Sequence, residues 1–146
     1  MTSGALPQTA AGGIVLFVDD EPRVLSGFRD TLRKEPYQLL TVNSASAALE
    51  LLAEHQVDVV VSDEQMPIMC GSVFLEHVRQ RYPNIVRIML TGEASLAVSV
   101  QAINDGLYRF LGKPIQPDEL RRVIRDALRM RALKAGPPRP PILRAR

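Results

Sequence analysis

Short apolar runs rich in β-branched residues alternate along this chain with segments in which apolar residues recur every three or four positions. The short runs predict five β-strands, at residues 14–18, 38–42, 57–62, 86–90 and 108–111. The third run is apolar almost throughout, which is typical of a strand that is buried on both faces of a parallel sheet.

The longer segments predict helices in the gaps between the strands. Four of them are expected at residues 22–34, 46–55, 71–81 and 95–105. A last helix is the clearest, because it has two faces of different character: Leu120, Val123, Ile124, Ala127 and Leu128 on one, and Arg121, Arg122, Arg125 and Arg129 on the other. We expect its apolar face to pack and its arginine face to be solvated.

Five strand–helix units in succession predict an α/β fold with a parallel sheet and helices on both of its faces, because right-handed crossovers leave few other arrangements. In open sheets of this kind, ligands bind beyond the carboxyl ends of the strands. The residues that follow each strand are therefore the first place to look for chemistry.

Polar side chains follow four of the five predicted strands. Asp19 and Asp20 follow the first strand, Asp63 the third, Thr91 the fourth and Lys113 the fifth. In a parallel sheet these groups converge at one edge. Taken alone, each has an ordinary structural explanation, such as a helix N-terminus, a turn or a surface loop, but together they indicate a functional site.

The clustered carboxylates indicate a metal site and a nucleophile. Three carboxylates this close repel one another unless some are protonated or a cation is bound. Hard oxygen ligands suit Mg²⁺, which keeps several waters and leaves room for a phosphoryl oxygen. An aspartate carboxylate can attack phosphorus to form an acyl phosphate, while Lys113 neutralises charge and Thr91 donates a hydrogen bond. We therefore expect Asp19, Asp20 and Asp63 to form a Mg²⁺ site.

Charge is distributed unevenly along the 146 residues. Residues 1–120 carry nine Lys and Arg against fifteen Asp and Glu, whereas residues 121–146 carry nine against one. The basic end has arginines at helical spacing and no interleaved aromatic residue. We therefore expect a solvated helix face followed by a linker, and no direct binding of nucleic acid.

The composition predicts one folded unit over residues 14–135, of a size usual for a single domain. Residues 1–13 are expected to be a flexible leader, and the Pro- and Arg-rich residues 136–146 a tail or linker. No apolar run is long enough to span a membrane, and no export signal is visible. The lone Cys70 cannot form an internal disulfide, so a cytoplasmic protein is expected.

Four motifs in this chain resemble those of the receiver domain of two-component response regulators, the family that includes chemotaxis response regulators. They are Val18-Asp19-Asp20-Glu21-Pro22, Ser62-Asp63-Glu64-Gln65-Met66-Pro67-Ile68-Met69-Cys70-Gly71, Leu90-Thr91-Gly92-Glu93-Ala94 and Phe110-Leu111-Gly112-Lys113-Pro114. Their order and spacing cover essentially all of residues 14–130. The resemblance implies a flavodoxin-like, doubly wound (βα)5 fold whose five-stranded parallel sheet has strand order 2-1-3-4-5.

The resemblance also implies a role for each residue of the site. Asp63 would accept a phosphoryl group from a phosphohistidine on a sensor histidine kinase or a phosphotransfer protein. Lys113 and Thr91 would bind the resulting aspartyl phosphate. Mg²⁺ would have four protein ligands: Asp19, Asp20, Asp63 and the backbone carbonyl of Gln65.

Phe110 corresponds to the switch aromatic of the family, which would turn inward when Thr91 moves toward the phosphate. The face made by the fourth helix, fifth strand and fifth helix would then act on an output domain or target, and would also serve a homodimer. The Lys113–Pro114 peptide would be cis. The chain would be a phosphorylation-dependent signalling switch, and not an enzyme beyond its own phosphoryl transfer and autodephosphorylation.

The chain departs from the family pattern at two positions. Cys70 stands where Asp is usual, and Phe110 where Tyr is also common; both bear on the phosphate lifetime or the readout. The segment 108–111 resembles receivers joined to cyclic-dinucleotide phosphodiesterase domains. Three residues flank the site and would position or block the water that removes the phosphate: Glu64, Gln65 and Glu93.

Two other interpretations stay open. A phosphate-independent, degenerate receiver would keep the fold and act as a binding module. An aspartyl-phosphate phosphatase of the haloacid dehalogenase type typically needs Asp two positions after its nucleophile, where this chain has Gln65. The sequence leaves open the kinase, the signal, the output and whether the receiver stands alone.

Overall fold

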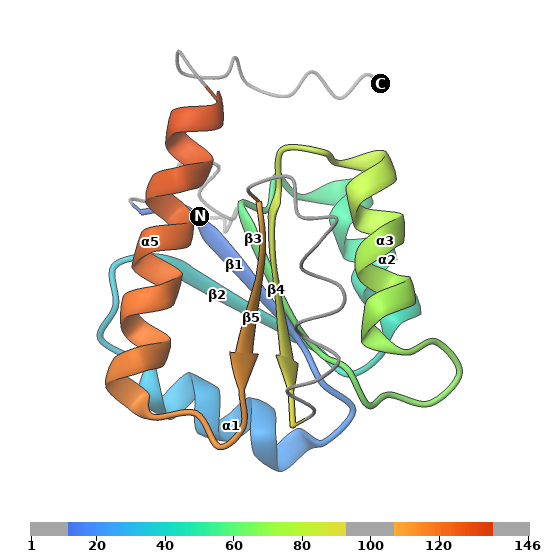
Figure 1. The fold of residues 1–146 in the computed structure, drawn as a ribbon, viewed down its shortest axis with the longest axis horizontal. Coiled ribbons are helices and arrows are strands. Elements are labelled where there is room, and N and C mark those ends of the chain that lie inside the picture. The colour runs from blue at the N-terminus through green and yellow to red at the C-terminus, as the bar shows by residue number, and fades with distance from the viewer. Residues whose placement is uncertain (1–11, 93–106, 136–146) are drawn as a thin grey trace, which may run out of the picture.

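A computed structural model of the chain describes residues 12–92 and 107–135. Five parallel strands form one sheet in the order β2-β1-β3-β4-β5, with helices on both faces (Figure 1). The predicted fold and strand order are confirmed. The elements are β1 (Ile14–Val18), α1 (Pro22–Thr31), β2 (Gln38–Val42), α2 (Ala45–Glu54), β3 (Val59–Asp63), α3 (Gly71–Arg81), β4 (Val86–Thr91), β5 (Tyr108–Gly112) and α5 (Pro117–Ala135).

The helix predicted at residues 95–105 lies outside the described residues. The predicted limits of the folded unit, residues 14 and 135, stay predictions. No helix in the described ranges is long and apolar enough to cross a membrane.

The register of the strands brings their carboxyl ends level at one edge of the sheet. Val18 at the end of β1 pairs with Ser62, so Asp19 comes level with Asp63. On the other side of β3, Asp63 pairs with Leu90, and Thr91 pairs with Gly112 at the end of β5. The polar residues after β1 and at the ends of β3 and β4 therefore meet at this edge.

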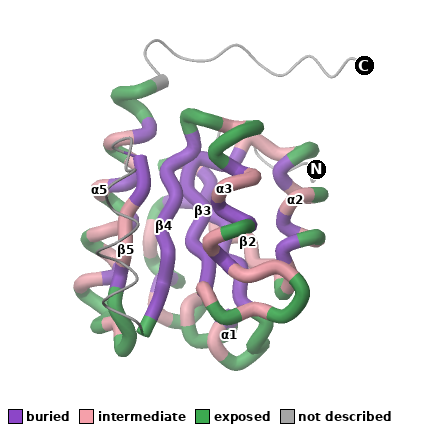
Figure 2. The backbone as a smooth tube through the Cα atoms, turned by 45° about the vertical axis from the view of Figure 1, so that its right-hand side comes forward, coloured by how far each residue is buried: buried purple, intermediate pink, exposed green. Residues whose placement is uncertain are grey.

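The core has two layers, one on each face of the sheet. One layer packs apolar residues of α1 and α5 against the sheet, and the other packs those of α2 and α3. Figure 2 shows β3 and β4, which are buried along their whole length, at the centre of the fold. All five residues of β3 are buried, as its apolar run predicts. The alternation of strand residues between the two layers follows from the two-residue period of a strand.

Two predicted boundaries differ from the structure by two residues or more, and the others that differ do so by one residue. Helix α1 ends at Thr31 and not at Lys34, because the chain leaves the helix in tighter turns, in which the Arg33 N–H donates to the Asp30 carbonyl and the Glu35 N–H to the Leu32 carbonyl. Strand β3 begins at Val59 and not at Val57, since the Val57 N–H bonds back to the His55 carbonyl in a turn.

Two arginines are buried, and one of them, Arg131, lies in the basic segment whose helix face was expected to be solvated. Arg87 in β4 is only 2% exposed, and Arg131 of α5 is also buried. The Arg131 Nε lies 3.6 Å from the Asp58 carboxylate, whose other oxygen accepts a hydrogen bond from the Ile14 N–H. The arginines predicted on the outer face of α5 do lie there, and three form ion pairs: Arg121 with Asp118, Arg125 with Glu35 and Arg129 with Asp126.

Candidate functional site

Asp19 and Asp20 lie where the chain leaves β1 and turns into α1. The Asp19 N–H donates to the Val42 carbonyl of the neighbouring strand, at 3.2 Å, which holds the backbone in the sheet. The Asp19 Oδ1 accepts a hydrogen bond of 2.9 Å from the Glu21 N–H, closing a turn just before Pro22 opens the helix. Asp19 is buried as a result, whereas Asp20 is exposed.

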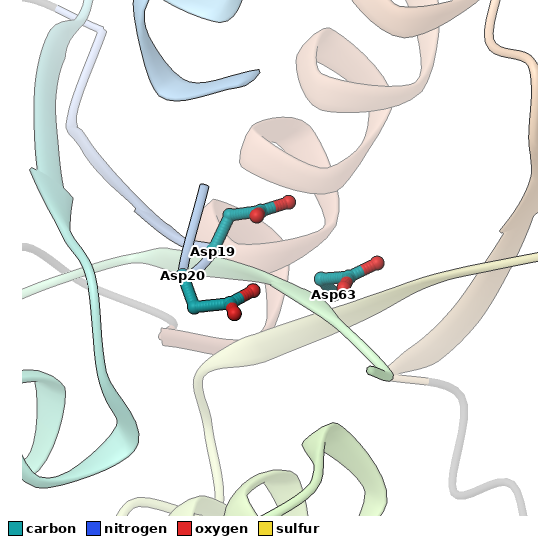
Figure 3. A group of neighbouring side chains, drawn as sticks. All are labelled: Asp19, Asp20 and Asp63. Carbon is teal, nitrogen blue, oxygen red and sulfur yellow. The ribbon is translucent and has the colours of Figure 1, made fainter. Parts of the chain in front are cut away.

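The structure brings the two acids after β1 together with Asp63, the last residue of β3. Each of the three carboxylates offers an oxygen, and these oxygens all lie within 4.8 Å of one another. Figure 3 shows the carboxylates of Asp19 and Asp20 turned toward that of Asp63. Asp63 is only 4% exposed, so its carboxylate is almost entirely removed from water.

Lys113 completes this cluster from the position directly after β5. Its ammonium contacts the buried Asp63 carboxylate, while the Lys113 side chain itself is 40% exposed. The Lys113 N–H donates to the Thr91 carbonyl at 3.0 Å, which ties the ends of β4 and β5 together. The Lys113–Pro114 peptide is cis, as the resemblance implies.

The electrostatics of Asp19 favour a bound cation. Burial raises the pKa of Asp19, and the negative charges of Asp63 and Asp20 raise it further. The Glu21 N–H and the Lys113 ammonium oppose this rise. The buried Oδ2 of Asp19 has no hydrogen-bond partner among the described residues. A divalent cation would satisfy this oxygen and offset the repulsion, and oxygen ligands of this kind suit Mg²⁺.

The loop after Asp63 is held by contacts that the sequence did not indicate. The Glu64 carboxylate accepts a hydrogen bond of 2.8 Å from the Ser72 N–H and so caps the start of α3, where Cys70 makes no side-chain cap. A Cβ at Gly71 would lie 2.3 Å from the Asp63 carbonyl oxygen, so only glycine fits there. The Glu64 carboxylate is thus engaged at the start of α3, and its predicted effect on the water that removes the phosphate stays a prediction.

The remaining predicted site residues lie around this centre. Thr91 is buried at the end of β4, and Phe110 is half-buried on β5. Gln65 lies in the exposed loop two residues beyond Asp63, and its carbonyl stays a predicted ligand. Glu93 lies outside the described residues.

Residues 15–125 match the family model described as the response regulator receiver domain. The chain belongs to this family. Receiver domains are the signalling domains of response regulators in two-component systems, for which an aspartyl phosphate and Mg²⁺ are standard.

Curated relatives of this receiver domain are longer response regulators. The hydrogenase transcriptional regulatory protein HoxA of Cupriavidus necator is 39% identical over 121 residues, which are 82% of this chain and 25% of HoxA. The transcriptional regulatory protein GlrR of Escherichia coli is 34% identical, over 81% of this chain and 27% of GlrR. The receiver domain thus spans about a quarter of the length of these relatives.

Solved receiver structures share the fold. The signal receiver domain of an HD domain-containing protein from Pseudomonas fluorescens Pf-5 has a TM-score of 0.77 and 36% identity, covering 86% of this chain and 93% of that one. The chemotaxis response regulator CheY4 of Vibrio cholerae has a TM-score of 0.70 and 29% identity, covering 79% and 98%. Membership of this family disfavours the phosphatase interpretation.

Proposed function

We propose that this receiver domain is a phosphorylation-dependent signalling switch whose phosphoacceptor is Asp63. The supporting observation is that the buried Asp63 carboxylate contacts the Lys113 ammonium and lies among the carboxylates of Asp19 and Asp20. This arrangement places a nucleophile, a neutralising ammonium and a cation site side by side, which are the groups that phosphoryl transfer needs. The proposed donor is a phosphohistidine on a sensor histidine kinase or a phosphotransfer protein.

In the proposed reaction an oxygen of the Asp63 carboxylate attacks phosphorus, the phosphorus–nitrogen bond of the donor breaks, and the imidazole that leaves takes up a proton. Lys113 neutralises charge on the new acyl phosphate, and the Thr91 hydroxyl donates a hydrogen bond to a phosphoryl oxygen. When bound, Mg²⁺ supplies further positive charge for the phosphoryl oxygens. Its proposed ligands are Asp19, Asp20, Asp63 and the backbone carbonyl of Gln65.

The proposed readout couples the aspartyl phosphate to Phe110. Thr91 moves toward the phosphoryl group, and Phe110 turns inward into the space that Thr91 leaves. This changes the face formed by β5, α5 and the fourth helix, which acts on an output domain or target and also serves a homodimer. The relatives HoxA and GlrR are named as transcriptional regulatory proteins, and the Pseudomonas fluorescens protein is named as HD domain-containing. The proposed output is therefore either a transcriptional regulatory domain or an HD domain.

The proposal is tested by incubating the protein with Mg²⁺ and acetyl phosphate and measuring its intact mass. The wild-type protein is expected to gain the mass of one phosphoryl group, and Asp63→Ala is expected to gain none. Asp118→Ala removes an exposed carboxylate at the start of α5 and is the matched control, which should be phosphorylated like the wild type.

Each other outcome has a definite meaning. A wild-type protein that gains no phosphoryl group overturns the proposal and favours the degenerate receiver that binds a partner without phosphate. Phosphorylation that persists in Asp63→Ala shows that another residue is the acceptor. Multiple turnover of a small phosphate ester would indicate a phosphatase.

A further inference from the structure

A buried arginine and two aromatic rings form a column on one face of β4 and β5. Arg87 of β4 pairs with Tyr108 of β5, and Met89 pairs with Phe110, so these four residues lie on the same face of two neighbouring strands. The Arg87 guanidinium carbon lies 5.2 Å from the centroid of the Tyr108 ring. The Tyr108 and Phe110 centroids are 5.1 Å apart, with 35° between the ring planes. The Phe110 ring therefore packs on the Tyr108 ring, and the Tyr108 ring in turn contacts the Arg87 guanidinium.

The Arg87–Tyr108 pair that supports Phe110 is buried. Arg87 is almost fully buried, and Tyr108 is buried too. A guanidinium over an aromatic face is attracted to the ring, more strongly when both are removed from water. Burial raises the pKa of Tyr108 to about 12, so the phenol stays neutral beside the cation. Such a pair fixes the plane on which Phe110 rests.

The other side of Phe110 is different. The next residue of β5 on the same face is Gly112, which is exposed and pairs with Thr91. A methyl group at Gly112 would meet no atom of the described residues within 4 Å. The Phe110 ring is thus bounded by Tyr108 toward the amino end of the strand and by a residue without a side chain toward the phosphoacceptor.

From this geometry we infer that Tyr108, held by Arg87, is a positioning residue that keeps Phe110 stacked and so sets how readily the switch leaves that position. The inference rests on the proposed function, in which phosphorylation draws Phe110 toward Thr91. Stacking on Tyr108 and the inward position compete for the same ring. An aromatic pair contributes about 1 kcal/mol beyond its buried area, which corresponds to about a fivefold change in the equilibrium between the two positions.

The test follows Phe110 directly. The protein is labelled with 4-fluorophenylalanine at its four Phe positions, and the Phe110 resonance is assigned as the one missing from Phe110→Leu. The labelled protein is titrated with beryllofluoride in the presence of Mg²⁺, and the midpoint of the Phe110 response is measured. Beryllofluoride binds a carboxylate as a tetrahedral phosphoryl mimic, so its apparent affinity is linked to the switch equilibrium.

Tyr108→Leu is expected to lower the midpoint about fivefold, because the stacked position loses its partner. Tyr108→Phe keeps the ring and should stay within about twofold of the wild type. Arg87→Met leaves Tyr108 in place without its cation and should lower the midpoint by a smaller factor. This variant tests the inference even if Tyr108→Leu fails to fold. Phe28→Leu is the matched control, since it removes an aromatic pair with Phe17 on the opposite face of the sheet.

An unchanged midpoint in both Tyr108→Leu and Arg87→Met overturns the inference, as does an equal change in Phe28→Leu. A wild-type protein that accepts a phosphoryl group on Asp63 with no displacement of the Phe110 resonance also overturns it, while leaving the phosphoacceptor intact. A protein that accepts no phosphoryl group at all overturns the proposed function together with the inference.

Discussion

Ile68 combines a left-handed backbone with an exposed, β-branched side chain. Its φ is 72°, and the Met69 N–H donates to the Pro67 carbonyl at 2.7 Å, so a tight γ-turn closes around it. The left-handed region costs an L-residue roughly 1–2 kcal/mol, and β-branched residues tolerate it least. Because the Ile68 side chain is fully exposed, no packing offsets this cost.

We expect Ile68→Asn to raise the free energy of unfolding by about 1 kcal/mol, since Asn tolerates left-handed backbone and no buried contact is lost. Urea denaturation at pH 7 measures the change. Val73→Asn is the matched control, because Val73 is also exposed but lies in helix α3, where Val and Asn have similar propensities. A neutral or destabilising effect of Ile68→Asn would show that the turn is not strained.

At the scale of elements, an ion pair joins the segment after α1 to helix α5. The Arg125 guanidinium donates two hydrogen bonds to the Glu35 carboxylate, of 2.9 and 2.8 Å. These hydrogen bonds lower the pKa of Glu35 below its ordinary value of 4.5, and the charges of Arg125 and Arg121 add to the effect. A carboxyl group whose pKa is lowered by folding stabilises the protein above its unfolded pKa and ceases to do so as the pH falls through its folded pKa.

Glu35→Gln is therefore expected to lower the melting temperature at pH 7 and to lose this effect as the pH falls below 4.5. Thermal unfolding of variant and wild type across this pH range measures the difference. Asp126→Asn breaks an ion pair within one exposed helix face, Arg129 with Asp126, and should change the melting temperature less. A difference for Glu35→Gln that does not depend on pH would mean that the hydrogen bonds act without the carboxylate charge.

Most elements were predictable from periodicity alone. The bounds of β1, β2 and α3 agree with the sequence pattern, since each is delimited by a clear change between apolar and polar residues or by Pro and Gly. The end of α1 was missed because its apolar pattern continues to Leu32, which packs in the core although the last helical residue is Thr31. The burial of Arg87 had no sequence signal, because the Tyr108 ring that its guanidinium contacts lies on a neighbouring strand, and only the folded sheet brings the two together.

At the scale of the whole molecule, the convergence of the acids followed from parallel topology, because Asp19, Asp20 and Asp63 end neighbouring strands. The strand order itself came from the family resemblance, as strand–helix alternation is compatible with more than one order. The cap of α3 by Glu64 had no sequence signal, because capping residues are expected directly before a helix. The pairing of Asp58 with Arg131 was equally hidden, since it joins residues far apart in the chain.

The three carboxylates of Asp19, Asp20 and Asp63 form the site at one edge of the sheet, but their mutual repulsion lowers the free energy of unfolding. Their oxygens lie within 4.8 Å of one another, and the Lys113 ammonium offsets only part of the repulsion. A cation that binds the folded state alone stabilises it by an amount that grows with its concentration. At ten times its dissociation constant, Mg²⁺ is expected to raise the free energy of unfolding by about 1.4 kcal/mol, and a chelator should reverse the gain.

Asp20→Asn separates the repulsion among the carboxylates from the stabilisation by Mg²⁺. It removes one charge from the cluster at an exposed position, while Asp19 and Asp63 stay in place. Without Mg²⁺ this variant should melt at a higher temperature than the wild type. Adding Mg²⁺ should raise its melting temperature by less than it raises that of the wild type. The control is Asp118→Asn, which removes a carboxylate at the start of α5. Adding Mg²⁺ should raise the melting temperature of this variant as much as that of the wild type. An equal Mg²⁺ effect in Asp20→Asn would show that the ion acts elsewhere, and then the repulsion among these acids would have to be offset by Lys113 and protonation alone.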